Sequence, residues 1–177
     1  MQHWEDAQLL SRIAVGDKAA MKVFYERHRE ALAGFLRSRG AAPEEVADVL
    51  HDAMLDVWHA AARYRAAASV RTWLFAIARN KFVDRVRRND RLSFVAAVPE
   101  PAEVEPSTET LLANAQDAAR VRSCLANLKT VQRVVVRLAF FEGLSYEEIS
   151  ELEKIPPGTV KSRIHHAKQA LLRCLGR

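Results

Sequence analysis

The stretch GLSYEEISELEKIPPGTVKSRIHHAKQALL, residues 143–172, decides the fold of the C-terminal part of the chain. Ser145 followed by Glu148 forms a capping box, which predicts the start of a short helix. The sequence PPG at 156–158 then predicts a turn, and a second helix follows it. Apolar residues recur along that second helix at helical spacing and predict its buried face: Val160, Ile164, Ala167 and Leu171. A short helix, a tight turn and a longer second helix indicate a helix-turn-helix.

The outward face of the second helix is polar and basic. It carries Lys161, Ser162, His165, His166 and Lys168, with Arg163 at its edge. Such side chains can donate hydrogen bonds to phosphates and to guanine, so this face is suited to a DNA major groove. The adjacent pair His165 and His166 also raises the possibility of metal ligands. Neighbouring residues on a helix point about 100° apart, which makes that second interpretation weak.

The rest of the chain reads as helix on both sides of a break at residues 93–110, SFVAAVPEPAEVEPSTET, where three prolines interrupt every periodicity. The N-terminal helices are expected at about 5–15, 17–40, 43–63 and 70–89, with Asp17 as the cap of the second and Ser69 as the cap of the fourth. The C-terminal helices are expected at about 117–128, 130–141, 145–152 and 158–175. The predicted fold is therefore all-α, with two small helical domains joined by a flexible acidic linker.

Charge is distributed unevenly within a formal net charge of +5. Residues 69–91 hold seven basic and two acidic side chains, and residues 154–177 hold six basic and no acidic ones. Residues 92–118 between them hold five acidic side chains and no basic one. Two basic clusters on one small protein indicate a polyanion as partner.

The helix expected at 43–63 carries a stripe of carboxylates, Asp48, Asp52 and Asp56, spaced four residues apart on one face. Like charges at this spacing repel one another. The stripe is either an ordinary solvated face or a docking surface for a basic partner, which would relieve the repulsion. His51 with Asp48 and Asp52 has the composition of a metal-ligand set, but no second helix supplies further ligands.

The helix expected at 70–89 mixes aromatic and basic side chains. Its apolar stripe should pack into the core and comprises Val70, Leu74, Ile77, Ala78 and Phe82. Arg71, Arg79, Lys81, Arg87 and Arg88 lie outside that stripe and can meet phosphates. Trp73 and Phe75 flank it, and an aromatic face beside cations suits the stacking of single-stranded bases. Each of these two aromatic residues could equally be part of the core.

The two cysteines, Cys124 and Cys174, lie fifty positions apart without a Cys-x-x-Cys or Cys/His pattern. We therefore expect neither a disulfide scaffold nor a zinc module. We also expect the protein to lie in a reducing compartment. No apolar run reaches the roughly 18–20 residues that a membrane span requires. These features predict a cytoplasmic protein.

Four stretches together resemble bacterial RNA polymerase sigma factors of the extracytoplasmic-function (ECF, group 4) type in the sigma-70 family. VADVLHDAMLDVW (46–58) and SVRTWLFAIARNKFVDRVRR (69–88) resemble region 2. LANLKTVQRVVVRLAFFEGLSYEEIS (125–150) and PPGTVKSRIHHAKQALL (156–172) resemble region 4. The resemblance implies region 2 over residues 1–91, a linker over 92–112 and region 4 over 113–177.

The resemblance also implies roles for individual residues. Core polymerase would be bound by Asp48, His51, Asp52, Leu55 and Asp56. The −10 element would be opened and held as single strands by Tyr64, Ser69, Arg71, Trp73, Arg79, Asn80, Lys81, Asp84 and Arg88. The duplex −35 element would be read by Thr159, Lys161, Ser162, Arg163, His165, His166 and Lys168.

The family further implies promoter DNA and core RNA polymerase as partners, an anti-sigma factor that is often membrane-anchored, and a part in a stress response. It implies no catalysis, cofactor, metal or small-molecule substrate. Four positions depart from the family pattern: His51, Lys129, Lys154 and His166 stand where glutamine, proline, glycine and arginine are common.

A stand-alone helix-turn-helix regulator is the alternative, although it explains neither the carboxylate stripe nor the basic, aromatic helix. A nucleic-acid enzyme fits poorly, because the carboxylates share one helix face without convergent partners.

Overall fold

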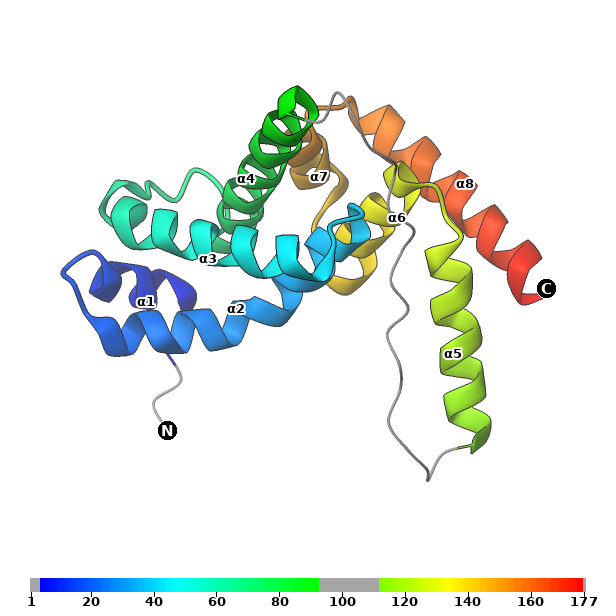
Figure 1. Ribbon diagram of the computed structural model, residues 1–177, viewed down its shortest axis with the longest axis horizontal. Coiled ribbons are helices and arrows are strands. Elements are labelled where there is room, and N and C mark those ends of the chain that lie inside the picture. The colour runs from blue at the N-terminus through cyan, green and yellow to red at the C-terminus, as the bar shows by residue number, and fades with distance from the viewer. Residues whose placement is uncertain (1–3, 93–111, 177) are drawn as a thin grey trace. The chain divides into compact units, whose positions relative to one another are not determined.

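The computed structural model describes residues 4–92 and 112–176, which are helical without a strand (Figure 1). They belong to two compact units, unit 1 (Met1–Arg37 and Ala41–Pro99) and unit 2 (Ser38–Gly40 and Glu100–Arg177). The all-α class predicted from the periodicity is confirmed. The acidic linker predicted between the domains lies mostly in 93–111, outside the described residues. Within the described parts, no helix has the length and apolar character needed to cross a bilayer.

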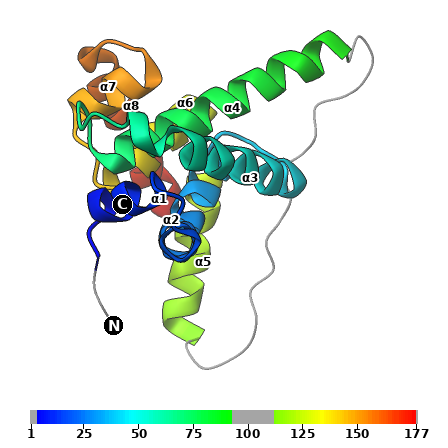
Figure 2. The ribbon, with the colours of Figure 1, turned by 90° about the vertical axis from the view of Figure 1, so that its left-hand side faces the viewer.

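The described part of unit 1, residues 4–92, contains four α-helices and one short 3-10 turn. They are α1 (Asp6–Ile13), α2 (Lys18–Ser38), α3 (Pro43–Ala60), the 3-10 turn (Ala61–Arg63) and α4 (Val70–Leu92). α3 and α4 lie side by side (Figures 1 and 2). The core comes from all four helices and includes Leu9, Phe24, Phe35, Val49, Leu74 and Phe75. Phe75, which the sequence left between core and DNA platform, is 1% exposed and packs edge-on against Phe35, so it is a core residue.

Polar contacts fix the helix starts in unit 1. Asp17 Oδ1 accepts hydrogen bonds from the amides of Ala19 and Ala20 at 2.9 and 3.0 Å, as expected of the cap of α2. Ser69 Oγ accepts from the amide of Thr72 at 3.1 Å and caps α4. Both caps were predicted from the sequence.

A partly buried ion cluster ties α1 to α2. Nε2 of His28 lies 3.0 Å from one oxygen of Asp6, and Nη1 of Arg27 lies 2.6 Å from the other. The His28 hydrogen bond, with a further contribution from Arg27, lowers the pKa of Asp6 to about 2 from 3.8, although partial burial opposes the shift.

Unit 2 comprises α5 (Leu112–Ala126), α6 (Thr130–Val136), a π-helical turn (Arg137–Phe141), α7 (Tyr146–Glu153) and α8 (Pro157–Leu175). Its core includes Val135, Leu138, Ile149, Leu152, Val160, Ile164 and Ala167. The predicted capping box at the start of α7 is present: Ser145 Oγ accepts from the Glu148 amide at 3.1 Å, and the Ser145 amide donates to the Glu148 carboxylate at 2.9 Å. α7, the turn and α8 form the predicted helix-turn-helix.

Two of the residues that depart from the family pattern have backbone conformations typical of the residues that are common there. Lys154 ends α7 with φ 56° and ψ 47°, the left-handed conformation that glycine adopts at least cost. Lys129 caps α6 with φ −56°, within the range that proline would impose. The lysines therefore occupy the conformations of the residues that they replace.

The expectation about the cysteines is wrong. Cys124 and Cys174 form a disulfide, with their Cα atoms 5.8 Å apart. Fifty residues separate them in sequence, but the end of α5 packs against the end of α8 in unit 2. Sequence spacing carries no information about that tertiary contact.

Candidate nucleic-acid interface

α8 presents a polar face opposite its buried one. Val160, Ile164 and Ala167 are at most 2% exposed and seat the helix against α6 and α7. The predicted −35 residues lie elsewhere on α8: Lys161, Ser162, His165, His166 and Lys168 are exposed, and Thr159 and Arg163 are half-buried. The structure thus places this predicted set on one helix. The buried residues of α8 fix which of its faces points outward.

Several of these side chains have local contacts. Ser162 Oγ donates to the Thr159 carbonyl at 3.0 Å, and the rings of His165 and His166 lie 5.8 Å apart. Nζ of Lys168 lies 5.3 Å from the ring centre of Phe140, a 57% exposed residue that the sequence did not single out. No three His, Cys, Asp or Glu residues converge within the described parts of the chain, so nothing there supports the metal interpretation of the paired histidines.

In unit 1, Tyr64 of the loop before α4 forms an aromatic pair with Trp73 of α4. The rings of Tyr64 and Trp73 lie 5.3 Å apart, and both residues are half-buried. The Tyr64 hydroxyl donates to the Ala68 carbonyl at 2.6 Å and so holds the loop closed. Ala66 has φ 53°, a left-handed conformation that is costly for a residue with a Cβ. Trp73, unlike Phe75, keeps part of its ring accessible for stacking.

The remaining predicted −10 residues follow along α4. Arg71, Asn80, Asp84 and Arg88 are exposed, and Arg79 and Lys81 are half-buried. Nη1 of Arg79 approaches Asn80 Oδ1 at 3.5 Å, and Nε of Arg88 donates to the Asp84 carbonyl at 3.3 Å. The structure therefore arranges these residues along one helix that begins at the Tyr64–Ser69 loop.

The carboxylate stripe of α3 is partly neutralised by α4, which the sequence did not predict. Arg85 Nη2 lies 2.6 Å from Asp48 Oδ2, and Lys81 Nζ lies 2.9 Å from Asp56 Oδ1. Asp52 is exposed and forms no ion pair with another described residue. Lys81 was predicted to contact DNA, but its ammonium would have to leave Asp56 before it could reach a phosphate.

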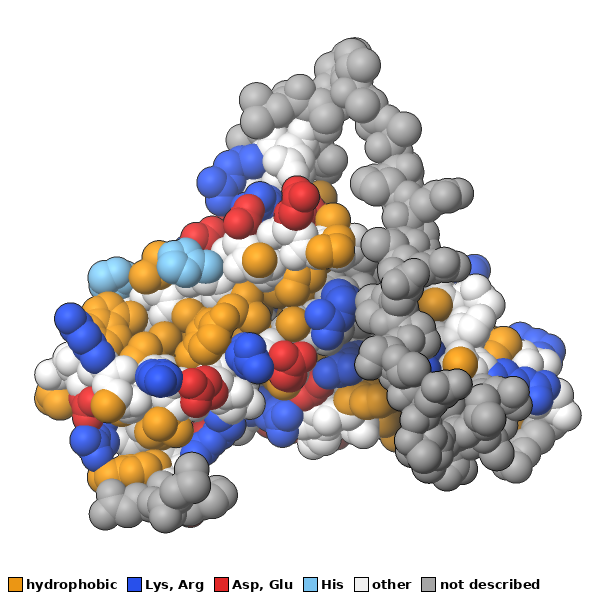
Figure 3. All heavy atoms as spheres, turned by 60° about the horizontal axis from the view of Figure 1, so that its bottom comes forward, with side chains coloured by type: hydrophobic (Ala, Val, Ile, Leu, Met, Phe, Trp, Pro, Cys, Tyr) orange, Lys and Arg blue, Asp and Glu red, His pale blue; other side chains and the backbone are white. Residues whose placement is uncertain are grey.

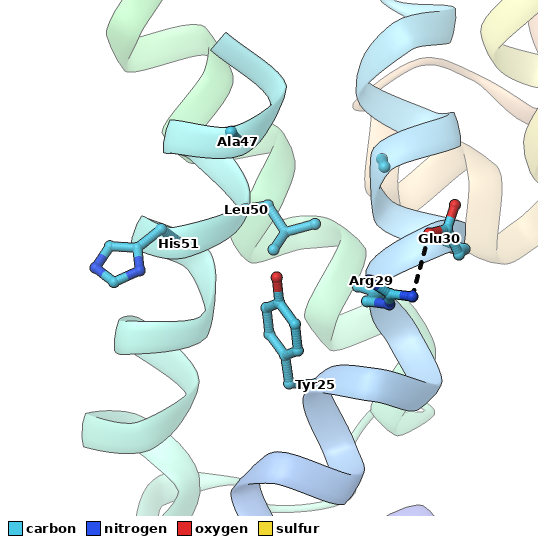
Figure 4. Close-up of a pocket in the computed structure, with 7 residues that line it drawn as sticks. Tyr25, Arg29, Glu30, Ala47, Leu50 and His51 are labelled. Carbon is cyan, nitrogen blue, oxygen red and sulfur yellow. Dashed lines mark ion pairs between the residues drawn. The ribbon is translucent and has the colours of Figure 1, made fainter. Parts of the chain in front are cut away.

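A shallow apolar groove of about 360 Å³ lies beside the stripe, between α2 and α3. Hydrophobic side chains gather there next to histidines on the surface (Figure 3). Its lining includes Met21, Tyr25, Leu55 and Trp58, with Leu55 45% exposed. Tyr25 also lines an adjoining hollow of about 310 Å³, where it points toward Leu50 while His51 points away from α2 (Figure 4). Of the residues that line this groove, His51 and Leu55 were predicted as polymerase contacts. The exposed Tyr25 was not predicted, because its position in the helical pattern indicates only that it belongs to α2.

Comparisons with known proteins agree with this arrangement. The family Sigma-70 region 2 matches residues 24–92, and the family Sigma-70, region 4 matches residues 118–171. The chain is 31% identical over 162 residues to the ECF RNA polymerase sigma factor RpoE of Cereibacter sphaeroides, covering 88% of this chain and 86% of that protein. It is 32% identical over 171 residues to the ECF sigma factor SigM of Mycobacterium tuberculosis, covering 97% of this chain and 85% of that protein.

Two solved structures resemble it as well. One is CnrH in complex with the cytosolic domain of CnrY, with a TM-score of 0.65 and 30% identity over 97% of each chain. The other is the sigma factor RpoE of Bartonella quintana in complex with the anti-sigma factor NepR, with a TM-score of 0.70 and 24% identity, covering 88% of this chain and 98% of that one; it bears on the fold alone. With region 2 and region 4 matches on the two basic units and relatives of this similarity along nearly its whole length, the chain belongs to the ECF RNA polymerase sigma factors.

Proposed function

We propose that the chain is the promoter-specificity subunit of a bacterial RNA polymerase, with residues 113–177 on the −35 element, residues 1–91 on the polymerase and the −10 element, and residues 92–112 connecting them. The single observation that carries this proposal is the arrangement of α8. A buried apolar row fixes the helix in a helix-turn-helix, and a row of exposed donors from Lys161 to Lys168 faces outward.

Unit 1 suits a different task. Opening a promoter exposes single-stranded bases, and Trp73 beside Tyr64 offers a partly accessible aromatic face on which a base can stack. Arg71 and Arg88 on α4 supply positive charge for the strand's phosphates. Separation of the strands needs no covalent chemistry, so in this proposal the chain acts by binding and is not an enzyme.

The polymerase contact is assigned to α3. Asp52 and the exposed Leu55 lie on successive turns of this helix, so a basic partner with apolar side chains could meet both. The ion pairs of Asp48 and Asp56 with α4 would exchange for pairs with the partner. Because CnrH, the solved relative at 30% identity, is in complex with the cytosolic domain of CnrY, we also propose that an anti-sigma factor holds this chain inactive in the cytoplasm.

The experiment is a pair of binding measurements. Core polymerase without a sigma factor is titrated with the full chain, and promoter DNA is then titrated with the chain alone and with the complex. Asp52→Arg should weaken polymerase binding, whereas Glu26→Arg on α2, an exposed site with the same change of charge, should not. Equal polymerase affinity for the two variants would overturn the docking assignment.

The same titrations separate the alternative function. A stand-alone regulator would bind duplex DNA specifically and tightly without polymerase. A sigma factor should bind poorly alone and gain promoter affinity in the complex. Tight specific binding by the free chain, together with no binding to polymerase, would favour the regulator.

A further inference from the structure

The disulfide joins the ends of two helices in unit 2. Cys124 lies in the last turn of α5 and Cys174 in the last turn of α8, the helix that carries the predicted DNA-reading side chains. The Cα separation of 5.8 Å is ordinary for a disulfide, so the folded unit brings the two thiols within bonding reach.

The two cysteines differ in access. Cys124 is 3% exposed, whereas Cys174 is an exposed residue on the final turn of α8. Thiol–disulfide exchange requires in-line approach of a thiolate to one sulfur. An external thiol therefore reaches the bond from the side of Cys174, and Cys124 is the leaving thiolate.

Among the residues of α5 whose burial the structure describes, few besides Cys124 hold α5 against α8. Residues 118–123 of α5 are all exposed. The apolar contacts come from Leu125 at the end of α5 and Leu128 just after it, which pack with Ala167, Ala170 and Leu171. Beyond Leu171, residues 172–174 of α8 are exposed as well. After cleavage of the disulfide, Leu125 and Leu128 would still pack on α8, whereas the exposed residues 118–123 of α5 and 172–174 of α8 would lose the bond that lies beside them.

The front of α8 is anchored independently. Val160 and Ile164 are buried against α6 and α7, away from Cys174. The helix-turn-helix therefore does not depend on the disulfide for its seating. The bond controls how α5, the first described helix after residues 93–111, is attached to that unit.

We propose that Cys124 and Cys174 form a reversible thiol–disulfide exchange site, whose reduction loosens residues 118–124 of α5 and the last turn of α8 while the helix-turn-helix stays folded. The co-reactant is a dithiol. One of its thiolates attacks the Cys174 sulfur and forms a mixed disulfide, and Cys124 leaves as a thiolate and takes up a proton. The second thiol of the dithiol then attacks the dithiol sulfur that is bonded to Cys174, which frees the Cys174 thiol. Two electrons and two protons thus pass to the protein, and the dithiol becomes a cyclic disulfide. Oxidised glutathione can drive the reverse reaction.

The test uses the full chain and dithiothreitol as the dithiol. Alkylation of the folded protein followed by intact-mass measurement counts free thiols: none is expected after treatment with oxidised glutathione and two after dithiothreitol. Hydrogen–deuterium exchange then compares the two forms. Amides in 118–126 and 172–175 should exchange at least about tenfold faster after reduction, whereas those in 160–167 should keep their protection.

The variant Cys124→Ser with Cys174→Ser is the matched control. It should show the exchange pattern of the reduced protein and should not respond to dithiothreitol. Circular dichroism checks that its helices form; if they do not, the comparison of oxidised and reduced wild-type protein decides alone. Free thiols after oxidation, a bond that resists dithiothreitol in the folded protein, or identical exchange in both forms would each overturn the proposal. Loss of protection across 160–167 on reduction would do so too, because the bond would then hold the whole unit together.

Discussion

Removal of the α4 cations that pair with the α3 carboxylates should strengthen binding to polymerase. In the free protein, Arg85 and Lys81 form ion pairs with Asp48 and Asp56, so a basic partner must displace them before it can pair with those carboxylates. The substitutions Arg85→Ala and Lys81→Ala leave both carboxylates available. Their combination tests whether the stripe is a docking surface or only a solvated face.

The size of the effect follows from the exposure of the pairs. The Asp48 side chain is 56% exposed and that of Asp56 44%, so solvent screens both pairs strongly. Exposed ion pairs contribute about 0.2–1 kcal/mol each. Because 1.4 kcal/mol corresponds to a tenfold change in affinity, each substitution should tighten binding by roughly 1.4- to 5-fold. The free energy of unfolding should fall by no more than about 1 kcal/mol per substitution.

The assay is titration of labelled chain with core polymerase in the absence of DNA, at low and at high salt. Arg87→Ala is the matched control, because Arg87 is an exposed residue of the same helix that forms no ion pair with another described residue. It corrects for the general loss of repulsion toward a basic partner. If the double variant binds no more tightly than Arg87→Ala, or binds more weakly, the docking role of the stripe is refuted.

Three further predictions concern stability and DNA reading. Since the pKa of Asp6 is lowered to about 2, its ionised form stabilises unit 1 above pH 4. The free energy of unfolding should therefore fall by about 2 kcal/mol as the pH falls from 4 to 2. In urea unfolding, Asp6→Asn should abolish this part of the pH dependence. Lys154→Gly should raise the free energy of unfolding by up to about 1 kcal/mol, because it relieves a left-handed φ of 56°, and a thermal midpoint that falls would contradict this reason. Lys161→Ala should weaken holoenzyme binding to the −35 element, by about 1–3 kcal/mol if Lys161 contacts a base. Gln169→Ala on the same helix should have little effect. Equal losses of promoter affinity for the two variants in a promoter-binding assay would count against the assignment.

Local signals in the sequence predicted most of the secondary structure. The caps at Asp17, Ser69 and Ser145 depend on residues within three positions of one another, and all three are present. The left-handed conformation of Lys154 is one that the residue after a helix commonly adopts. The helix-turn-helix was predictable because one contiguous stretch encodes it.

Contacts between distant segments were not predictable. The Cys124–Cys174 bond requires that the ends of α5 and α8 meet, and nothing in a spacing of fifty residues encodes this. The pairing of Lys81 with Asp56 likewise depends on the packing of α4 against α3, and it changes the expected availability of both side chains. Burial of Phe75 but not of Trp73 is set by Phe35 on α2. Patterns along one helix define its faces, but not what covers them.

The most direct test of the central claim is run-off transcription with purified chain and core polymerase lacking any sigma factor, on a library of promoter-containing templates. We predict promoter-specific transcripts only when the chain and the polymerase are both present, and their loss with Asp52→Arg but not with Glu26→Arg. No promoter-specific transcripts from any template, together with no binding of the chain to core polymerase, would contradict the assignment of a sigma-factor function.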